Sequence, residues 1–113
     1  MPITTHILDT SRGTPAASVS IVLDFLKSPG NWEAIATAQT NQDGRAPNLL
    51  PKHHVLEAGR YRLTFQTGAY FAALQAETFY PQIEIQFQIK DPSQHYHVPL
   101  LLSPFGFSTY RGS

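Results

Sequence analysis

The chain has 113 residues, of which 14% are charged, and eight basic side chains balance eight acidic ones. This length suits one domain, which we predict to span residues 1–113, and the even charge balance favours neither nucleic acid nor a membrane surface as a partner. The sequence contains no cysteine, which excludes disulfides and thiolate metal sites.

The first ten residues, MPITTHILDT, have neither the basic leader nor the apolar stretch of a signal peptide. No apolar run approaches the ~20 residues that a helix needs to cross a bilayer. We therefore expect a cytoplasmic protein, and only a periplasmic or peroxisomal targeting segment outside this sequence would change that expectation. Because so few residues are charged, we also expect identical subunits to cover part of the surface.

The first predicted strand is ITTHILD, residues 3–9. A strand places alternate side chains on opposite faces, so Ile3, Thr5 and Ile7 share the face that we expect in the core. His6 then lies on the outer face. Taken alone, an outward histidine is usually an ordinary surface residue.

Three further segments alternate apolar and polar residues in the same way, which predicts strands with one buried face. One short segment, GAYFAALQA at residues 68–76, is the only predicted helix. Turn signals separate these segments, and several short strands with one helix predict an all-β, two-sheet sandwich. The alternating segments are SVSIVLDF (18–25), RYRLTFQ (60–66) and QIEIQFQIK (82–90).

The middle of the chain contains TNQDGR, residues 40–45. Asp-Gly is a strong signal for a tight turn, so Arg45 should begin the next strand or extended segment. An arginine directly after a turn is usually solvated. His53 and His54, further along this patternless connection, are interpreted as solvated side chains.

The chain closes with HYHVPLLLSPFGFSTYRGS, residues 95–113. Alternation places His95 and His97 on one face and the apolar residues on the core face. A hairpin through SPFG, residues 103–106, would pair Leu101 with Ser108, and the same register sets His97 opposite Gly112. Glycine there would leave room beside the imidazole for a ligand.

Two histidines at this spacing could contribute to a metal site, but a closed zinc site needs four ligands. We therefore predict no metal and no cofactor. The sequence also lacks the motifs of a covalent nucleophile and of a phosphate-binding glycine loop. If the protein is an enzyme, general acid–base chemistry with an arginine to stabilise charge is what remains.

The segments THILDTSRGTPA, TNQDGR and HYHVPLLLSPFGFSTYRGS together resemble the transthyretin superfamily, and in particular its enzyme branch, the 5-hydroxyisourate hydrolases. The resemblance covers nearly the whole chain. The terminal Tyr-Arg-Gly-Ser is its most specific element, because the hormone-carrying branch does not end this way. The family fold implies a sandwich of about eight strands with one short helix, four copies of which form a dimer of dimers with the sites in a central channel.

The resemblance implies hydrolysis of 5-hydroxyisourate, a small purine derivative, to 2-oxo-4-hydroxy-4-carboxy-5-ureidoimidazoline in urate catabolism. His97 or His6 would activate water, and which of the two does so stays open. His6, Arg45 and Tyr110 would also bind the substrate, and His95, Ser108 and Arg111 are secondary candidates. The implied catalytic set is His6, Arg45, His97, Tyr110 and Ser113.

Two other functions are weighed against the hydrolase. The first is a non-catalytic carrier of a small aromatic ligand, and the second is a structural sandwich in which the histidines are incidental. The carrier branch typically has lysine, glutamate and two threonines at the positions of His6, Arg45, His97 and Tyr110. Because all four positions hold the enzyme's residue, the resemblance favours the hydrolase. Gln82 departs from the family's usual glutamate, which affects only a peripheral charge.

Overall fold

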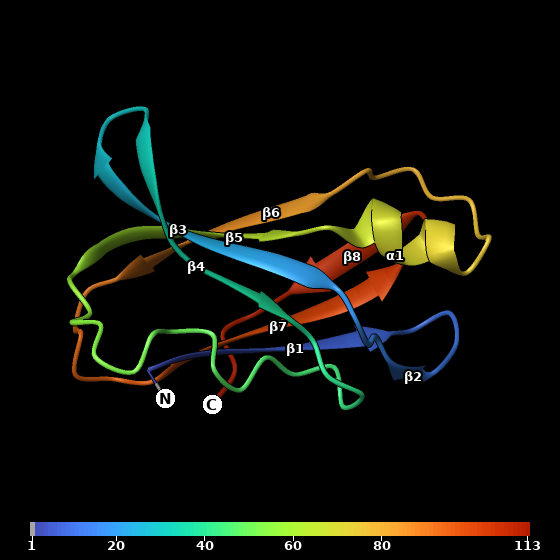
Figure 1. Cartoon of the computed structure of the whole chain (residues 1–113), viewed down its shortest axis with the longest axis horizontal. Coiled ribbons are helices and arrows are strands. Elements are labelled where there is room, and N and C mark those ends of the chain that lie inside the picture. Colours follow the sequence, from blue (N-terminus) through green and yellow to red (C-terminus); the bar gives the residue numbers. More distant parts are fainter. Residues whose placement is uncertain (1) are drawn as a thin grey trace.

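The computed structural model describes residues 2–113 as two sheets of four strands that enclose the core (Figure 1). One sheet has the strand order β2-β1-β7-β8 and the other β4-β3-β5-β6. The predicted all-β sandwich with one short helix is confirmed. The elements are β1 (Ile3–Asp9), β2 (Thr14–Pro15), β3 (Ser20–Ser28), β4 (Asn31–Gln39), β5 (Gly59–Phe65), α1 (Thr67–Ala73), β6 (Ile83–Ile89), β7 (Tyr96–Ser103) and β8 (Gly106–Thr109).

The core follows the alternation in the sequence. Along β1 every second residue from Ile3 to Asp9 is buried, and the residues between them, including His6, are only partly covered. Each large apolar side chain that is removed from water stabilises the fold by about 1.5–3 kcal/mol. The largest fully buried side chains come from both sheets and from α1: Tyr61, Phe65, Phe71, Ile3, Ile7, Ile21, Leu23, Leu49, Leu63, Ile89, Leu100 and Leu102.

Strand β4 was not predicted from the sequence, and its position explains why. It lies at the edge of its sheet and pairs only with β3, and that pairing shifts register between Leu23 and Asp24. Its residues, NWEAIATAQ, therefore show no steady alternation of buried and exposed side chains. The β3–β4 hairpin extends away from the body of the sandwich (Figure 1).

The predicted helix over residues 68–76 is wrong at its end, because α1 stops at Ala73. Gln75 has a left-handed backbone with φ of 57°, and a helix cannot continue through that conformation. The helix is held to the sheet by Tyr70, whose hydroxyl donates a hydrogen bond to Oδ2 of the fully buried Asp9 at 2.8 Å. Nowhere in residues 2–113 is there a helix long and apolar enough to cross a membrane.

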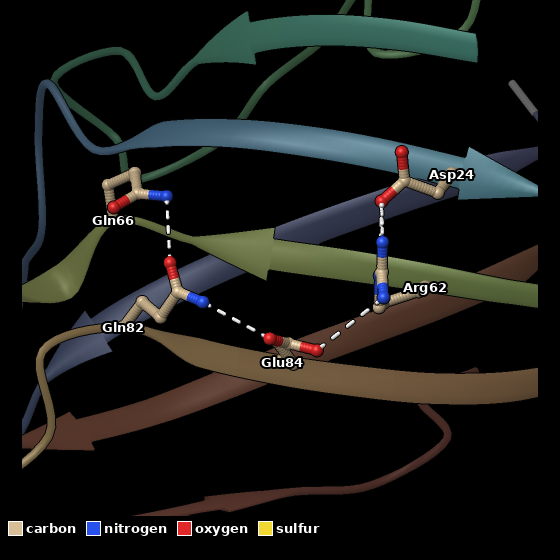
Figure 2. Close-up of polar contacts among 5 residues, drawn as sticks. All are labelled: Asp24, Arg62, Gln66, Gln82 and Glu84. Carbon is tan, nitrogen blue, oxygen red and sulfur yellow. Dashed lines mark hydrogen bonds and ion pairs between the residues drawn. The ribbon is translucent and has the colours of Figure 1, made fainter. Parts of the chain in front are cut away.

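The second sheet carries a row of polar contacts across its outer face (Figure 2). Arg62 on β5 pairs with Asp24 on β3 at 2.9 Å and lies 3.7 Å from a carboxylate oxygen of Glu84 on β6. Gln82 donates a hydrogen bond to Glu84 and accepts one from Gln66. This network ties three neighbouring strands together and gives Gln82 a structural contact, whereas the predicted site residues lie on the other sheet or beside it.

Candidate active site

The candidate site begins with the parallel pairing of β1 and β7, which lie side by side (Figure 1). The register sets Thr4 beside His97 and His6 beside Pro99. Thr4 and His6 are two residues apart on β1, so both side chains project from the outer face of the sheet. The pairing therefore brings the predicted His6 and His97 onto one face, although they are far apart in the sequence.

A tight turn brings Arg45 to the same place. Gly44 has φ of 74°, a conformation that favours glycine, and a Cβ there would overlap the carbonyl oxygen of Ile7. The Gly44 carbonyl accepts a hydrogen bond from the Ile7 amide at 2.8 Å. Arg45 then forms an isolated antiparallel bridge with His6 and is exposed. The predicted turn and the extended backbone at Arg45 are both confirmed.

The closing hairpin has the predicted register. Leu101 pairs with Ser108, and beyond β8 the chain returns to pair Gly112 with His97. The Gly112 amide donates a hydrogen bond to the His97 carbonyl at 2.8 Å. The expectation that this glycine leaves room for a ligand is wrong, because a Cβ on Gly112 would lie 2.5 Å from Cδ2 of His97. The imidazole itself fills the space that the missing side chain leaves.

Thr4 joins the two histidines of the HYH segment. Its Oγ1 lies 2.8 Å from Nε2 of His95 and 2.8 Å from Nδ1 of His97. The two rings are stacked with their centroids 6.4 Å apart. Sequence reasoning did not identify Thr4, although the alternation along β1 already placed it on the same face as His6.

The surroundings of His97 keep its ring neutral. Burial lowers the pKa of His97 from its ordinary value of 6.5, and repulsion from Arg45, and from His95 and His6 whenever they are protonated, lowers it further. A contact with the backbone of Thr4 acts in the opposite direction but is the smallest of these effects. At neutral pH the His97 imidazole is therefore uncharged and able to accept a proton.

Tyr110 and Ser113 lie in the closing segment beside His97. Tyr110 is 57% exposed, and Ser113, which follows Gly112, is also exposed. Tyr110 and His97 both line a cavity of about 310 Å³ between β6 and this segment. Tyr96 and Val98, whose side chains face the core, line the same cavity. The cavity therefore flanks the outer face that carries the histidines and is not formed by it.

The three secondary candidates are placed differently. His95 is exposed and joins the cluster through Thr4. Ser108 is exposed on β8, nearer the hairpin turn. Arg111 donates a hydrogen bond to Oε1 of Gln94 at 3.0 Å, and its guanidinium lies 4.7 Å from the centroid of the Tyr96 ring. Arg111 thus holds the closing segment against β7.

His53 and His54 are exposed in the connection between β4 and β5, as predicted. Neither belongs to the group on the outer face of β1 and β7. The structure therefore separates the five histidines of the chain into a cluster of three (His6, His95 and His97) and a solvated pair.

The fold and this cluster define a transthyretin-type sandwich with histidine and arginine on the outer face of one sheet. The model of the HIUase/Transthyretin family matches residues 3–112. The chain belongs to this family, which confirms the resemblance found in the sequence.

Curated relatives and solved structures agree with this assignment. The 5-hydroxyisourate hydrolase of Salmonella typhimurium is 46% identical over 98% of this chain and 80% of the relative. The 5-hydroxyisourate hydrolase of Mus musculus is 44% identical over 99% of this chain and 95% of the relative. The structure of Klebsiella pneumoniae 5-hydroxyisourate hydrolase covers 98% of both chains with a TM-score of 0.84 and 42% identity. Sea bream transthyretin, solved in complex with thyroxine, has a TM-score of 0.92 and 34% identity over 99% of this chain and 95% of its own.

Proposed function

We propose that this chain is a 5-hydroxyisourate hydrolase that acts in urate degradation. The fold cannot separate the two branches of the family, because the sea bream transthyretin superposes at least as well as the Klebsiella hydrolase. Sequence identity does separate them, at 42–46% to hydrolases against 34% to that transthyretin. The observation that carries the proposal is the placement of His97 on one face with the bridged pair His6 and Arg45, where burial lowers the pKa of His97.

The proposed reaction is the addition of water to a ring carbonyl followed by cleavage of the adjacent carbon–nitrogen bond. His97 accepts a proton from water as its oxygen bonds to the carbonyl carbon, and the ring nitrogen leaves with a proton. The ring then opens toward 2-oxo-4-hydroxy-4-carboxy-5-ureidoimidazoline. The lowered pKa of His97 supports its choice as the base, because the ring must be neutral to take the proton.

The other predicted residues take supporting roles in this proposal. Arg45 presents a planar set of donors to the substrate carbonyls and to the negative charge that develops on oxygen. His6, which is bridged to Arg45, orients the water or protonates the leaving nitrogen. Tyr110 and Ser113 complete the pocket by hydrogen bonding. The proposal requires no metal and no cofactor.

We place the site at the interface of a homotetramer. The histidine face of the single chain is open, with His95 and Arg45 exposed. A facing subunit would exclude water and enclose a small purine derivative there. Exposed aromatic side chains support an assembly, since Phe79 is 72% exposed and Phe105 65%. A cytoplasmic location stays a prediction from the sequence.

The alternative is a carrier that holds a small aromatic ligand without turnover. The close superposition on sea bream transthyretin is the observation that favours it. It predicts saturable binding of a substrate analogue and no change in the rate at which 5-hydroxyisourate decays. The same assay therefore separates the two functions.

The test compares three variants in the decay of 5-hydroxyisourate, generated from urate by urate oxidase and followed by absorbance. We expect His97→Ala to lower kcat/KM by about 10²–10⁴-fold, the usual loss on removing a general base. Arg45→Ala should lower it as well, and His54→Ala, at an exposed histidine outside the cluster, should leave it unchanged. Full activity in a normally assembled His97→Ala protein would remove His97 from the mechanism.

A further inference from the structure

Thr4 occupies a position that the proposed reaction does not yet use. Its side chain lies on the outer face of β1 and contacts both His95 and His97. The Oγ1 atom is 2.8 Å from a ring nitrogen of each histidine. The backbone fixes this arrangement, because the register pairs Thr4 with His97 directly. Both contacts have the length of an ordinary hydrogen bond.

A threonine hydroxyl has one proton to donate and can accept through its lone pairs. The two imidazole nitrogens therefore cannot both accept from Thr4, and at least one of them must carry a proton and donate. In two arrangements the Thr4 hydroxyl donates its proton to one histidine and accepts a hydrogen bond from the other. Each fixes which nitrogen of His97 is protonated.

In the first arrangement Nδ1–H of His97 donates to Thr4, and Thr4 donates to Nε2 of His95. The Nε2 atom of His97 is then unprotonated and can take a proton from water. When it does, the Nδ1–H bond to Thr4 is unchanged, so the chain of hydrogen bonds persists through the proton transfer. In the second arrangement Thr4 donates to His97, and Nε2 of His97 already carries a proton.

We propose that Thr4 is a positioning residue that holds His97 in the tautomer with the proton on Nδ1, with His95 as the acceptor that orients the Thr4 hydroxyl. The choice of this tautomer and its effect on rate both rest on the proposed function, because only a base at Nε2 needs the proton on Nδ1. The measurement of the tautomer needs no hydrolase activity. The same contacts give the exposed His95 a role, since it receives the one proton that Thr4 can donate.

The test uses three variants of the full chain. Thr4→Val removes the hydroxyl and keeps the shape of the side chain, and Thr4→Ser keeps the hydroxyl. Thr10→Val is the matched control, because Thr10 also donates a hydroxyl bond from the end of β1 to β7, at 3.1 Å to the Leu102 carbonyl, but at a distance from the histidines along the strand. Circular dichroism and thermal unfolding establish that each variant is folded.

The tautomer of His97 is read from two-bond ¹H–¹⁵N correlations of ¹⁵N-histidine-labelled protein at a pH above the titration of its histidines. We expect the Nδ1–H form in the unmodified protein, in Thr4→Ser and in Thr10→Val, and a mixture of both forms in Thr4→Val. An Nε2–H form in the unmodified protein would overturn the proposal, and this measurement needs no variant. The same tautomer in Thr4→Val as in the unmodified protein would also overturn it.

The rate gives an independent reading. We expect Thr4→Val to lower kcat about tenfold while KM changes by less than about twofold, and Thr4→Ser to restore most of the loss. A comparable fall in kcat in Thr10→Val would indicate a general structural effect and contradict the proposal. If the unmodified protein does not hydrolyse 5-hydroxyisourate, the proposed function fails, and the tautomer measurement alone still decides the role of Thr4.

Discussion

At the residue scale, several contacts of the candidate site converge on His97. Thr4 bonds its Nδ1, and Gly112 lies against its Cδ2 edge. The positive charge of Arg45 acts on the same ring, and His95 and His6 add to it when they are protonated. The environment of His97 thus fixes both the position and the charge of the imidazole, which is what a general base requires.

The charge state of His97 sets the pH dependence of the reaction. Because its pKa lies below 6.5, kcat/KM should be level at neutral pH and fall only as the pH decreases through that lower value, where the ring becomes protonated. Arg45→Gln removes one of the positive charges and should raise the pKa of His97. The NMR titration of His97 in both proteins measures this directly. A midpoint above 6.5 in the unmodified protein would contradict the account.

Gly112 tests how closely the ring is packed. In Gly112→Ala the new methyl group would meet His97 Cδ2 at 2.5 Å, so the imidazole must move. We expect kcat/KM to fall more than about tenfold, since small displacements at a reacting centre are costly. Gly106→Ala in the same hairpin is the matched control, because its nearest neighbour would be Ser103 Oγ at 3.8 Å. Equal activity in the two variants would show that the ring does not depend on Gly112.

At the element scale, the sequence predicted which side of a strand is buried better than it predicted which strands pair with each other. The alternation of side chains along the strand correctly placed His6 away from the buried side of β1, because burial alternates along any strand that covers a core. It could not show that β1 lies parallel to β7, since that pairing joins residues more than ninety positions apart. For the same reason the contact of Thr4 with both histidines was missed.

The closing hairpin was the exception, because its partners are close in the sequence. The turn at Ser103–Gly106 fixed the register, and the register carried His97 to Gly112. The pairing alone did not show where the imidazole would lie. The space beside Gly112 was therefore assigned to a ligand, whereas the ring occupies it.

The bond between α1 and β1 gives a prediction at this scale. Asp9 is fully buried and accepts hydrogen bonds from Tyr70 and from the backbone and hydroxyl of Ser11. In Tyr70→Phe the carboxylate loses a donor, which should lower the free energy of unfolding by about 1.5–3 kcal/mol. Urea denaturation measures this change in the free energy of unfolding. Tyr80→Phe is the control, because Tyr80 is only partly buried. An unchanged midpoint would show that the bond contributes nothing net.

At the scale of the whole molecule, the outer faces of the two sheets have different roles. The sheet of β4, β3, β5 and β6 uses its polar side chains to bind its own strands together (Figure 2). The sheet of β2, β1, β7 and β8 presents the histidines and Arg45. Exposed aromatic residues gather at the end of the β7–β8 hairpin, where Phe79 and Phe107 both contact Tyr80 in a perpendicular, edge-to-face arrangement.

This distribution supports the assembly of four chains that the family resemblance implies and that we propose here. Covering the exposed aromatic side chains would bury apolar surface that a chain with 14% charged residues leaves open. Sedimentation equilibrium should give four times the chain mass of 12.6 kDa at micromolar concentration. A monomer at that concentration, with full hydrolase activity, would show that the site needs no facing subunit.

The most direct test of the central claim is the decay of 5-hydroxyisourate with and without the unmodified protein. The account predicts that decay accelerates in proportion to the protein added and that 2-oxo-4-hydroxy-4-carboxy-5-ureidoimidazoline is formed. Decay at the spontaneous rate in the presence of folded, assembled protein would contradict the hydrolase and leave the carrier as the function to test.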